Sequence, residues 1–220
     1  MSDDTAGRPA RRWLLVALVA VALVAVAFAV GRFTAFGASA APVRPSTVSA
    51  EAGFARDMQV HHSQAVEMAM EIYRKTGDEE LRTLSYDIAT AQSAQRGEMY
   101  GWLVEWGLPQ AGAPLMSWMA ASSEHGHDAE AATDAQLRDE MGMATDAQLA
   151  DLRSATGTAA DCLFLDLMIR HHEGAIPMAQ AVIELGDDAR VLTVAESMIT
   201  AQTSEIDAMK SIQNRLGCAG

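Results

Sequence analysis

Aromatic residues make up only 5% of this 220-residue chain, whereas alanine and methionine are used heavily. Alanine, methionine, leucine, glutamate and glutamine lose little conformational freedom in a helix, while strands favour the aromatic and β-branched residues that are scarce here. The length allows one domain of ordinary size plus an appendage. The composition therefore predicts an all-α fold.

Basic residues are also few, because 16 lysines and arginines stand against 29 aspartates and glutamates, for a formal net charge of −13. A nucleic-acid partner needs a basic face, so this balance excludes one. An acidic surface attracts cations, although it often serves only solvation. The chain also lacks a nucleophile elbow, a phosphate-binding glycine loop and a recognisable pair of acid–base carboxylates. We therefore predict that the protein is not an enzyme.

Charged residues are absent from Trp13 to Val30, and arginines precede this apolar run. These arginines are Arg8, Arg11 and Arg12. A helix of this length reaches about 27 Å, close to the thickness of a bilayer core. Arginines favour the cytoplasmic side, so we expect residues 1–12 in the cytoplasm and residues 13–33 to form a transmembrane anchor or signal segment. The prediction is a single-pass protein of the cell membrane with its C-terminal domain outside the cytoplasm.

The alternative is a secreted protein, because Ala38-Ser39-Ala40 has the small-x-small pattern of a signal-peptide cleavage site and cleavage near Ala40 would release the rest. Residues 34–49 form a linker rich in proline, alanine and serine.

Cysteine occurs only as Cys162 and Cys218, and neither lies in a CxxC metal-binding pattern. Outside the cytoplasm such a pair is typical of a disulfide.

An internal repeat with an offset of 110 residues organises the remainder of the chain. "MQVHHSQAVEMA" at 58–69 and "MIRHHEGAIPMA" at 168–179 place methionine and paired histidines at the same intervals, and the match extends over residues 54–107 and 164–217. Each copy predicts two helices joined by a short loop, at about 50–75 and 78–106, and again at about 158–185 and 187–216. Two antiparallel hairpins pack as a four-helix bundle, here residues 50–217 with a crossover at 108–157.

The repeated motif predicts a stripe of sulfur and imidazole groups inside this bundle. On a helix, Met58, one histidine of the pair, Ala65 and Met68 share one face. The candidate ligands are His61, His62, His171, His172, Met58, Met68, Met168, Met178, Met209 and Glu205. Methionine is a common filler of helical cores, so packing alone is the simpler interpretation of the stripe. Histidine pairs at the same place in both copies favour a metal site.

Adjacent helical residues diverge by about 100°, so only one ring of each pair points fully inward. The other is expected at the helix–helix seam or beside an acidic neighbour such as Asp57. Thioether and imidazole together suit copper, above all Cu(I). Zinc prefers cysteine, histidine and carboxylate, and a di-iron bundle needs Glu-x-x-His motifs, which do not occur near either histidine pair.

The crossover offers a second candidate cluster in the segments "EHGH" and "MGM", which look exposed. Its members are Met116, Met119, His125, His127, Met141 and Met143. These residues could bind Cu(II) through the histidines or Cu(I) through the methionines. The alternative interpretation is a flexible loop without a ligand. Thr145-Asp146 predicts the N-cap of a short helix within the crossover.

"FARDMQVHHSQAVEMA", "FLDLMIRHHEGAIPMA", "MGMATDAQLADLRSATG" and "AQTSEIDAMKSIQNRLG" resemble the domain of unknown function 305 family over about residues 49–217. The resemblance implies a ferritin-like helical bundle that is exported or anchored in the membrane. For some members it also implies copper binding outside the cytoplasm and a part in copper resistance. It points to both histidine pairs together with a set of methionines. These are Met58, Met68, Met178 and Met209, with Met141 and Met143 from the family's Met-Gly-Met-like segment.

The two copies differ at positions that matter for a metal, because Gln95 stands where the second copy has Glu205 and Ile88 where it has Met198. A symmetric two-metal site is therefore not expected. The main hypothesis is a protein that binds, buffers or hands on copper, with a copper-handling protein or a second copy as possible partners. The alternatives are a metal-dependent oxidoreductase that uses the bundle interior and a structural interaction module of the cell envelope.

Overall fold

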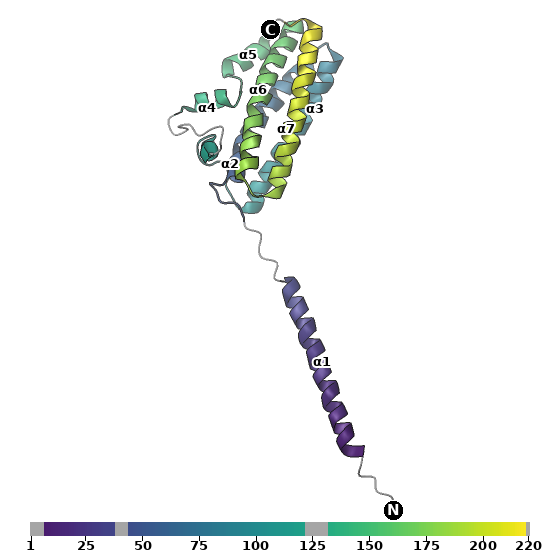
Figure 1. Cartoon of the computed structure of the whole chain (residues 1–220). Helices are drawn as coiled ribbons and strands as arrows, with labels where there is room; N and C mark the ends of the chain where they lie inside the picture. Colours follow the sequence, from purple (N-terminus) through teal and green to yellow (C-terminus); the bar gives the residue numbers. More distant parts are fainter. Residues whose placement is uncertain (1–6, 38–43, 122–131, 219–220) are drawn as a thin grey trace, which may run out of the picture. The chain divides into compact units, whose positions relative to one another are not determined.

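The computed structural model describes residues 7–37, 44–121 and 132–218, and within these residues it contains helices and no strand (Figure 1). The chain divides into two compact units, Met1–Val43 and Arg44–Gly220. His125 and His127 of the second candidate cluster lie outside the described residues, as does the cleavage pattern Ala38-Ser39-Ala40. The all-α fold predicted from the composition is confirmed.

The first unit consists of one long helix, α1 (Gly7–Gly37). Its segment Arg12–Val30 has 19 residues with a mean hydropathy of 3.0, and its side chains are exposed. This length and apolarity are enough to cross a membrane, and a signal sequence has the same properties. The protein therefore has an N-terminal apolar helix whose properties fit both a membrane anchor and a signal sequence.

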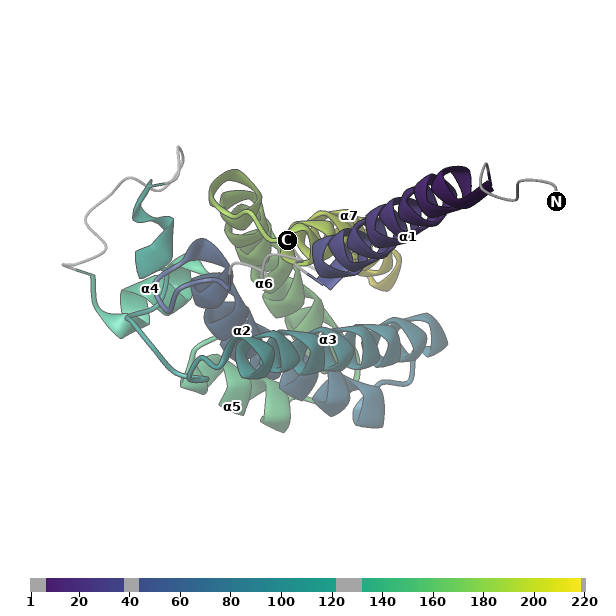
Figure 2. The ribbon, with the colours of Figure 1, turned by 90° about the horizontal axis from the view of Figure 1, so that it is seen from below.

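The second unit is built from two helical hairpins, as the internal repeat predicts. Helix α2 (Ala50–Lys75) pairs with α3 (Glu79–Trp106), and α6 (Gly157–Leu185) pairs with α7 (Ala189–Leu216) (Figure 1). The two hairpins meet mainly through α2 and α6, so these equivalent helices lie side by side at the centre (Figure 2). The result is a four-helix bundle with the histidine motifs on its two central helices.

Side-chain caps explain why three of the long helices begin where they do. The side chains of Ser49, Asp78 and Asp188 accept hydrogen bonds from the first free backbone amides of α2, α3 and α7. Helices α3 and α7 both end at a glycine in the left-handed conformation, Gly107 and Gly217. The equivalent helices therefore end at equivalent residues of the repeat.

The crossover between the hairpins contains a 3-10 helix, η1 (Ser117–Ala121), and two short helices, α4 (Asp134–Glu140) and α5 (Asp146–Ser154). The predicted cap at Thr145 is confirmed, because the Thr145 side chain accepts from the amide of Gln148 and the Gln148 side chain accepts from the amide of Thr145. Thr133 and Gln136 form the same capping box at the start of α4.

The predicted disulfide is confirmed between Cys162 and Cys218. It joins the first turns of α6 to the second residue after the end of α7, across 56 residues of sequence. Closing a loop of this size lowers the entropy of the unfolded chain and so stabilises the second hairpin.

The bundle core forms two apolar clusters, each drawn from all four long helices. Cluster one contains the start of α2, the end of α3, the end of α6 and the start of α7. Cluster two contains the opposite ends of the same helices. This division requires α2 and α6 to run antiparallel. The residues between the clusters, at the middle of the four helices, are polar.

Candidate metal centre

Four fully buried histidines form the middle of the bundle. His61 and His62 on α2 and His171 and His172 on α6 each have 0% of their surface exposed. The rings of His61 and His171 stack with their centroids 3.6 Å apart, while the two rings of each adjacent pair lie 6.1 and 6.3 Å apart. The predicted ligand pairs from the two copies therefore lie together in one layer, which we call the histidine layer.

Each imidazole uses its Nε2 atom for a hydrogen bond. His61 Nε2 lies 2.9 Å from the carbonyl oxygen of Met141, and His171 Nε2 lies 3.1 Å from the carbonyl oxygen of His61. At the outer side of the layer, His62 Nε2 lies 2.7 Å from Gln95 Oε1 and His172 Nε2 lies 2.7 Å from Glu205 Oε2. All four partners are oxygens that accept, so Nε2 donates in every case.

The Nδ1 atoms of all four histidines are buried and have no hydrogen-bond partner among the described residues. Burial lowers the pKa of His61 to about 4 and that of His62 to about 3, and it lowers the pKa of His171 well below its usual value. These three rings are neutral at physiological pH. With its proton on Nε2, each presents an unprotonated Nδ1 lone pair to the interior.

Two glutamines that were not among the predicted ligands complete the histidine layer. Gln92 on α3 and Gln202 on α7 are 3% exposed, and neither side-chain atom of either amide has a partner in the described part of the chain. Gln95, also not predicted as a site residue, holds His62. The offset of 110 residues gives a sequence signal for all three, because Gln92 matches Gln202 and Gln95 matches Glu205.

Methionines border the histidine layer on both sides, and all those predicted as ligands are buried. Met58, Met178, Met141 and Met143 belong to cluster one, and Met68, Met168 and Met209 belong to cluster two. Met99 and Met198, which the prediction did not include, lie one turn from Gln95 and Gln202 on their helices. The predicted methionine ligands therefore lie in the apolar clusters on either side of the histidine layer.

The prediction that Asp57 could hold a histidine is wrong. Asp57 Oδ2 accepts from the backbone amide of Met116 at 2.7 Å and from Trp118 Nε1 at 2.9 Å, so it fixes η1 to α2 instead. Burial raises the pKa of Asp57 to about 6, against the opposing effect of these two hydrogen bonds and of Arg56.

The impression that the Met-Gly-Met segment is exposed is also wrong, because Met141 is 0% exposed and Met143 is 3% exposed. The segment lies directly on α6. Gly142 has a φ of 70°, and a Cβ atom there would lie 2.2 Å from the carbonyl oxygen of Arg170. A Cβ atom at Gly174 would lie 2.1 Å from the carbonyl oxygen of Met141. Two glycines thus allow the backbone contact that brings the Met141 carbonyl to His61.

In residues 7–37, 44–121 and 132–218, no three side chains of His, Cys, Asp or Glu come together in a group that could hold a metal ion. The histidine layer gathers imidazole nitrogens and amides, with Glu205 as the carboxylate, and methionines lie in the clusters on either side. Imidazole and thioether donors together suit a soft ion such as Cu(I).

Solved structures share this fold. The putative secreted protein DUF305 from Streptomyces coelicolor is 39% identical, with a TM-score of 0.69 over 79% of this chain and 97% of that one. A DUF305 fragment from Deinococcus radiodurans is 29% identical, with a TM-score of 0.61 over 76% of this chain and 96% of that one. CopM in its Cu(I)-bound form is 23% identical, with a TM-score of 0.55 over 76% and 96%, and CopM has also been solved with Cu(II) and with Ag bound.

Comparison with curated proteins gives no match. Residues 51–213 match the family described as "Domain of unknown function (DUF305)". The match contains all four long helices of the bundle, apart from the outermost residues at each end, and the whole crossover. The chain belongs to the DUF305 family.

Proposed function

We propose that this protein binds and buffers copper, as Cu(I), in the histidine layer at the centre of its bundle. The observation that carries the proposal is the arrangement of His61, His62, His171 and His172. Every Nε2 donates to a protein oxygen, and every Nδ1 is buried and has no partner among the residues that the structure describes. Metal-binding histidines characteristically donate their other ring N–H to a carbonyl or carboxylate, which fixes the tautomer and the ring. A buried polar atom without a partner is costly, and a bound ion would remove that cost.

The charge and softness of Cu(I) suit this environment. The layer is fully buried, so a monovalent ion loses less hydration energy on entering it than a divalent one. Methionine sulfurs in the two adjoining clusters are soft, neutral donors that favour Cu(I). The Cu(I)-bound and Ag-bound forms of CopM, which has the same fold, are consistent with a family that accepts soft ions.

We also propose that α1 anchors the bundle outside the cytoplasmic membrane. The helix is long and apolar enough to span, arginines precede its apolar run, and the bundle has a disulfide that suits an oxidising compartment. Extraction of membranes at alkaline pH tests this, because an anchored protein stays with the lipid while a cleaved one is released.

Copper retention by histidine variants tests the proposed site. Replacing His171 and His172 together with alanine removes two of the four imidazoles, so Cu(I) retained by the bundle unit (residues 44–220) in equilibrium dialysis is expected to fall to background. The bundle unit has its own core and disulfide.

The matched control replaces His125 and His127 in the crossover. This double variant is expected to retain copper like the unmodified protein. If the crossover variant loses copper while the layer variant keeps it, the site lies in the crossover and the proposal fails. If the unmodified protein retains no copper, the proposed function itself is wrong.

A further inference from the structure

The four imidazoles of the histidine layer are completely buried, so an ion that binds there has to cross the protein first. Resting on the proposed function, we propose that the pocket between α2, α4 and the start of α5 is the port through which Cu(I) enters. Met143 is the first sulfur that the ion meets in this port, and Arg138 covers that sulfur until the ion arrives.

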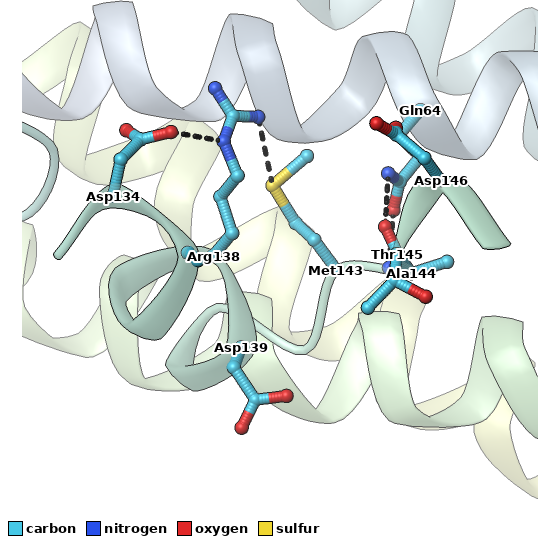
Figure 3. Close-up of a pocket in the computed structure, with 9 residues that line it drawn as sticks. Gln64, Asp134, Arg138, Asp139, Met143, Ala144, Thr145 and Asp146 are labelled. Atoms are coloured by element: carbon cyan, nitrogen blue, oxygen red, sulfur yellow. Dashed lines mark hydrogen bonds and ion pairs between the residues drawn. The ribbon is translucent and has the colours of Figure 1, made fainter. Parts of the chain in front are cut away.

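The pocket has a volume of about 440 Å³ and lies against the Met-Gly-Met segment (Figure 3). Its lining includes Gln64 of α2, Asp134, Arg138 and Asp139 of α4, Met143, and Asp146 at the start of α5. The pocket therefore brings solvent close to Met143, which belongs to cluster one.

The charged groups at this port have an excess of one negative charge. Asp134, Asp139 and Asp146 line the pocket. Asp134 pairs with Arg138 at 2.7 Å and Asp139 pairs with Arg170 at 2.5 Å, so Asp146 supplies the carboxylate charge that these two pairs do not offset. Carboxylates concentrated in a cleft raise the local concentration of cations and thus their rate of entry.

Arg138 lies between Asp134 and Met143 (Figure 3). Its Nε atom is 2.7 Å from Asp134 Oδ2, and its Nη1 atom is 3.9 Å from Met143 Sδ. The guanidinium thus lies against the thioether and places a positive charge where a cation would bind. Because both side chains of the Arg138–Asp134 pair are exposed, the pair holds Arg138 only weakly, and the guanidinium can turn away and leave the sulfur to the ion.

The same short segment connects the port to the histidine layer. Two residues before Met143, the carbonyl oxygen of Met141 accepts from His61 Nε2 at 2.9 Å. Beside it, Gln64, one turn after His61 on α2, accepts from the amide of Ala144 at 2.6 Å and donates to its carbonyl at 2.9 Å. Residues 141–144 therefore connect the pocket lining, at Met143 and Ala144, to His61 through the Met141 carbonyl.

Uptake kinetics test the port. The full-length chain in detergent is mixed with Cu(I) held by a chromophoric chelator, and transfer is followed by stopped-flow absorbance. Replacing Met143 with leucine keeps the volume and removes the sulfur, so we expect uptake to slow by about tenfold or more. Replacing Arg138 with glutamine is expected to speed uptake severalfold, and added salt to slow it.

Met70→Leu is the matched control, because Met70 lines a different pocket, between α2 and α5. It is expected to behave like the unmodified chain. If M143L takes up Cu(I) at the unmodified rate, the port is refuted. If M143L loses bound copper at equilibrium without a change in rate, Met143 is a resident ligand and the port is again refuted. No uptake by the unmodified chain refutes the proposed function as well.

Discussion

Gln95 and Glu205 occupy the same position in the two copies of the repeat, and each holds the outer histidine of its own half at 2.7 Å. An amide oxygen and a carboxylate differ in charge but hardly in shape. A carboxylate that accepts from a metal-binding histidine makes the ring a better ligand and offsets the charge of the ion. We therefore expect the His172 half to hold the proposed copper ion more strongly than the His62 half.

Replacing Glu205 with glutamine makes the two halves alike and removes the compensating charge. We expect this variant to bind Cu(I) about 10- to 100-fold more weakly, the range found when the partner of a metal-binding histidine is changed. Competition with a Cu(I) chelator measures the affinity.

Gln95→Glu is the reciprocal variant, and it is expected to bind Cu(I) more tightly than the unmodified bundle. Equal affinities for E205Q, Q95E and the unmodified protein would contradict the assignment of Glu205 to the site.

Single residues also show where prediction from the sequence ends. The paired histidines and their methionines could be found because the repeat displays them twice. The partner of His61 could not, since it is a backbone carbonyl that any residue at position 141 would supply. Nor could the sequence show that Asp57 serves η1, because the Asp57–Trp118 contact joins residues 61 positions apart.

Among the helices, α6 receives the closest contact of the crossover, because the Met141 carbonyl lies where a Cβ at Gly174 would be. Gly174→Ala is expected to lower the free energy of unfolding of the bundle unit by roughly 1–3 kcal/mol, since the clash is with backbone that has to shift. Urea denaturation followed by circular dichroism measures the change.

Gly101→Ala on α3 is the matched control. A Cβ at Gly101 meets nothing within 4 Å, so alanine there should stabilise the helix by about 0.5–1 kcal/mol. If both substitutions stabilise the protein, the Met-Gly-Met segment does not lie on α6 as described.

The ends of the long helices could be predicted closely, because serine, aspartate and glycine at their ends are local signals. Helix α2 spans Ala50–Lys75 as predicted, and α7 begins at Ala189, two residues later than the prediction. The docking of the crossover was not predictable, since it depends on contact between segments whose sequences carry no common pattern. The same contact buries the methionines that the sequence made look exposed.

For the whole molecule, burial of three neutral histidines predicts loss of stability in acid when no metal is bound. Below about pH 6.5 the unfolded chain takes up protons on His61, His62 and His171 that the folded bundle does not take up until their lowered pKa values are reached. Asp57 acts in the opposite direction, because its pKa is raised to about 6 and its folded form keeps a proton that the unfolded form releases.

The three histidines add about three protons to the unfolded chain relative to the folded one, and Asp57 offsets about one of them. About two extra protons therefore remain on the unfolded chain between pH 6 and 4. The free energy of unfolding of the metal-free bundle unit is therefore expected to fall by roughly 2–3 kcal/mol per pH unit in this window and to change little between pH 7 and 8. Urea titrations at several pH values measure this slope. A stability that stays constant down to pH 4 would contradict the burial of neutral imidazoles.

X-ray absorption at the copper edge of the Cu(I)-loaded bundle unit tests the central claim most directly. The account predicts both sulfur and imidazole nitrogen neighbours around the copper, with the same spectrum from the variant that lacks His125 and His127. Copper with sulfur neighbours and no imidazole, or a spectrum that changes only when His125 and His127 are removed, would contradict a copper site in the histidine layer.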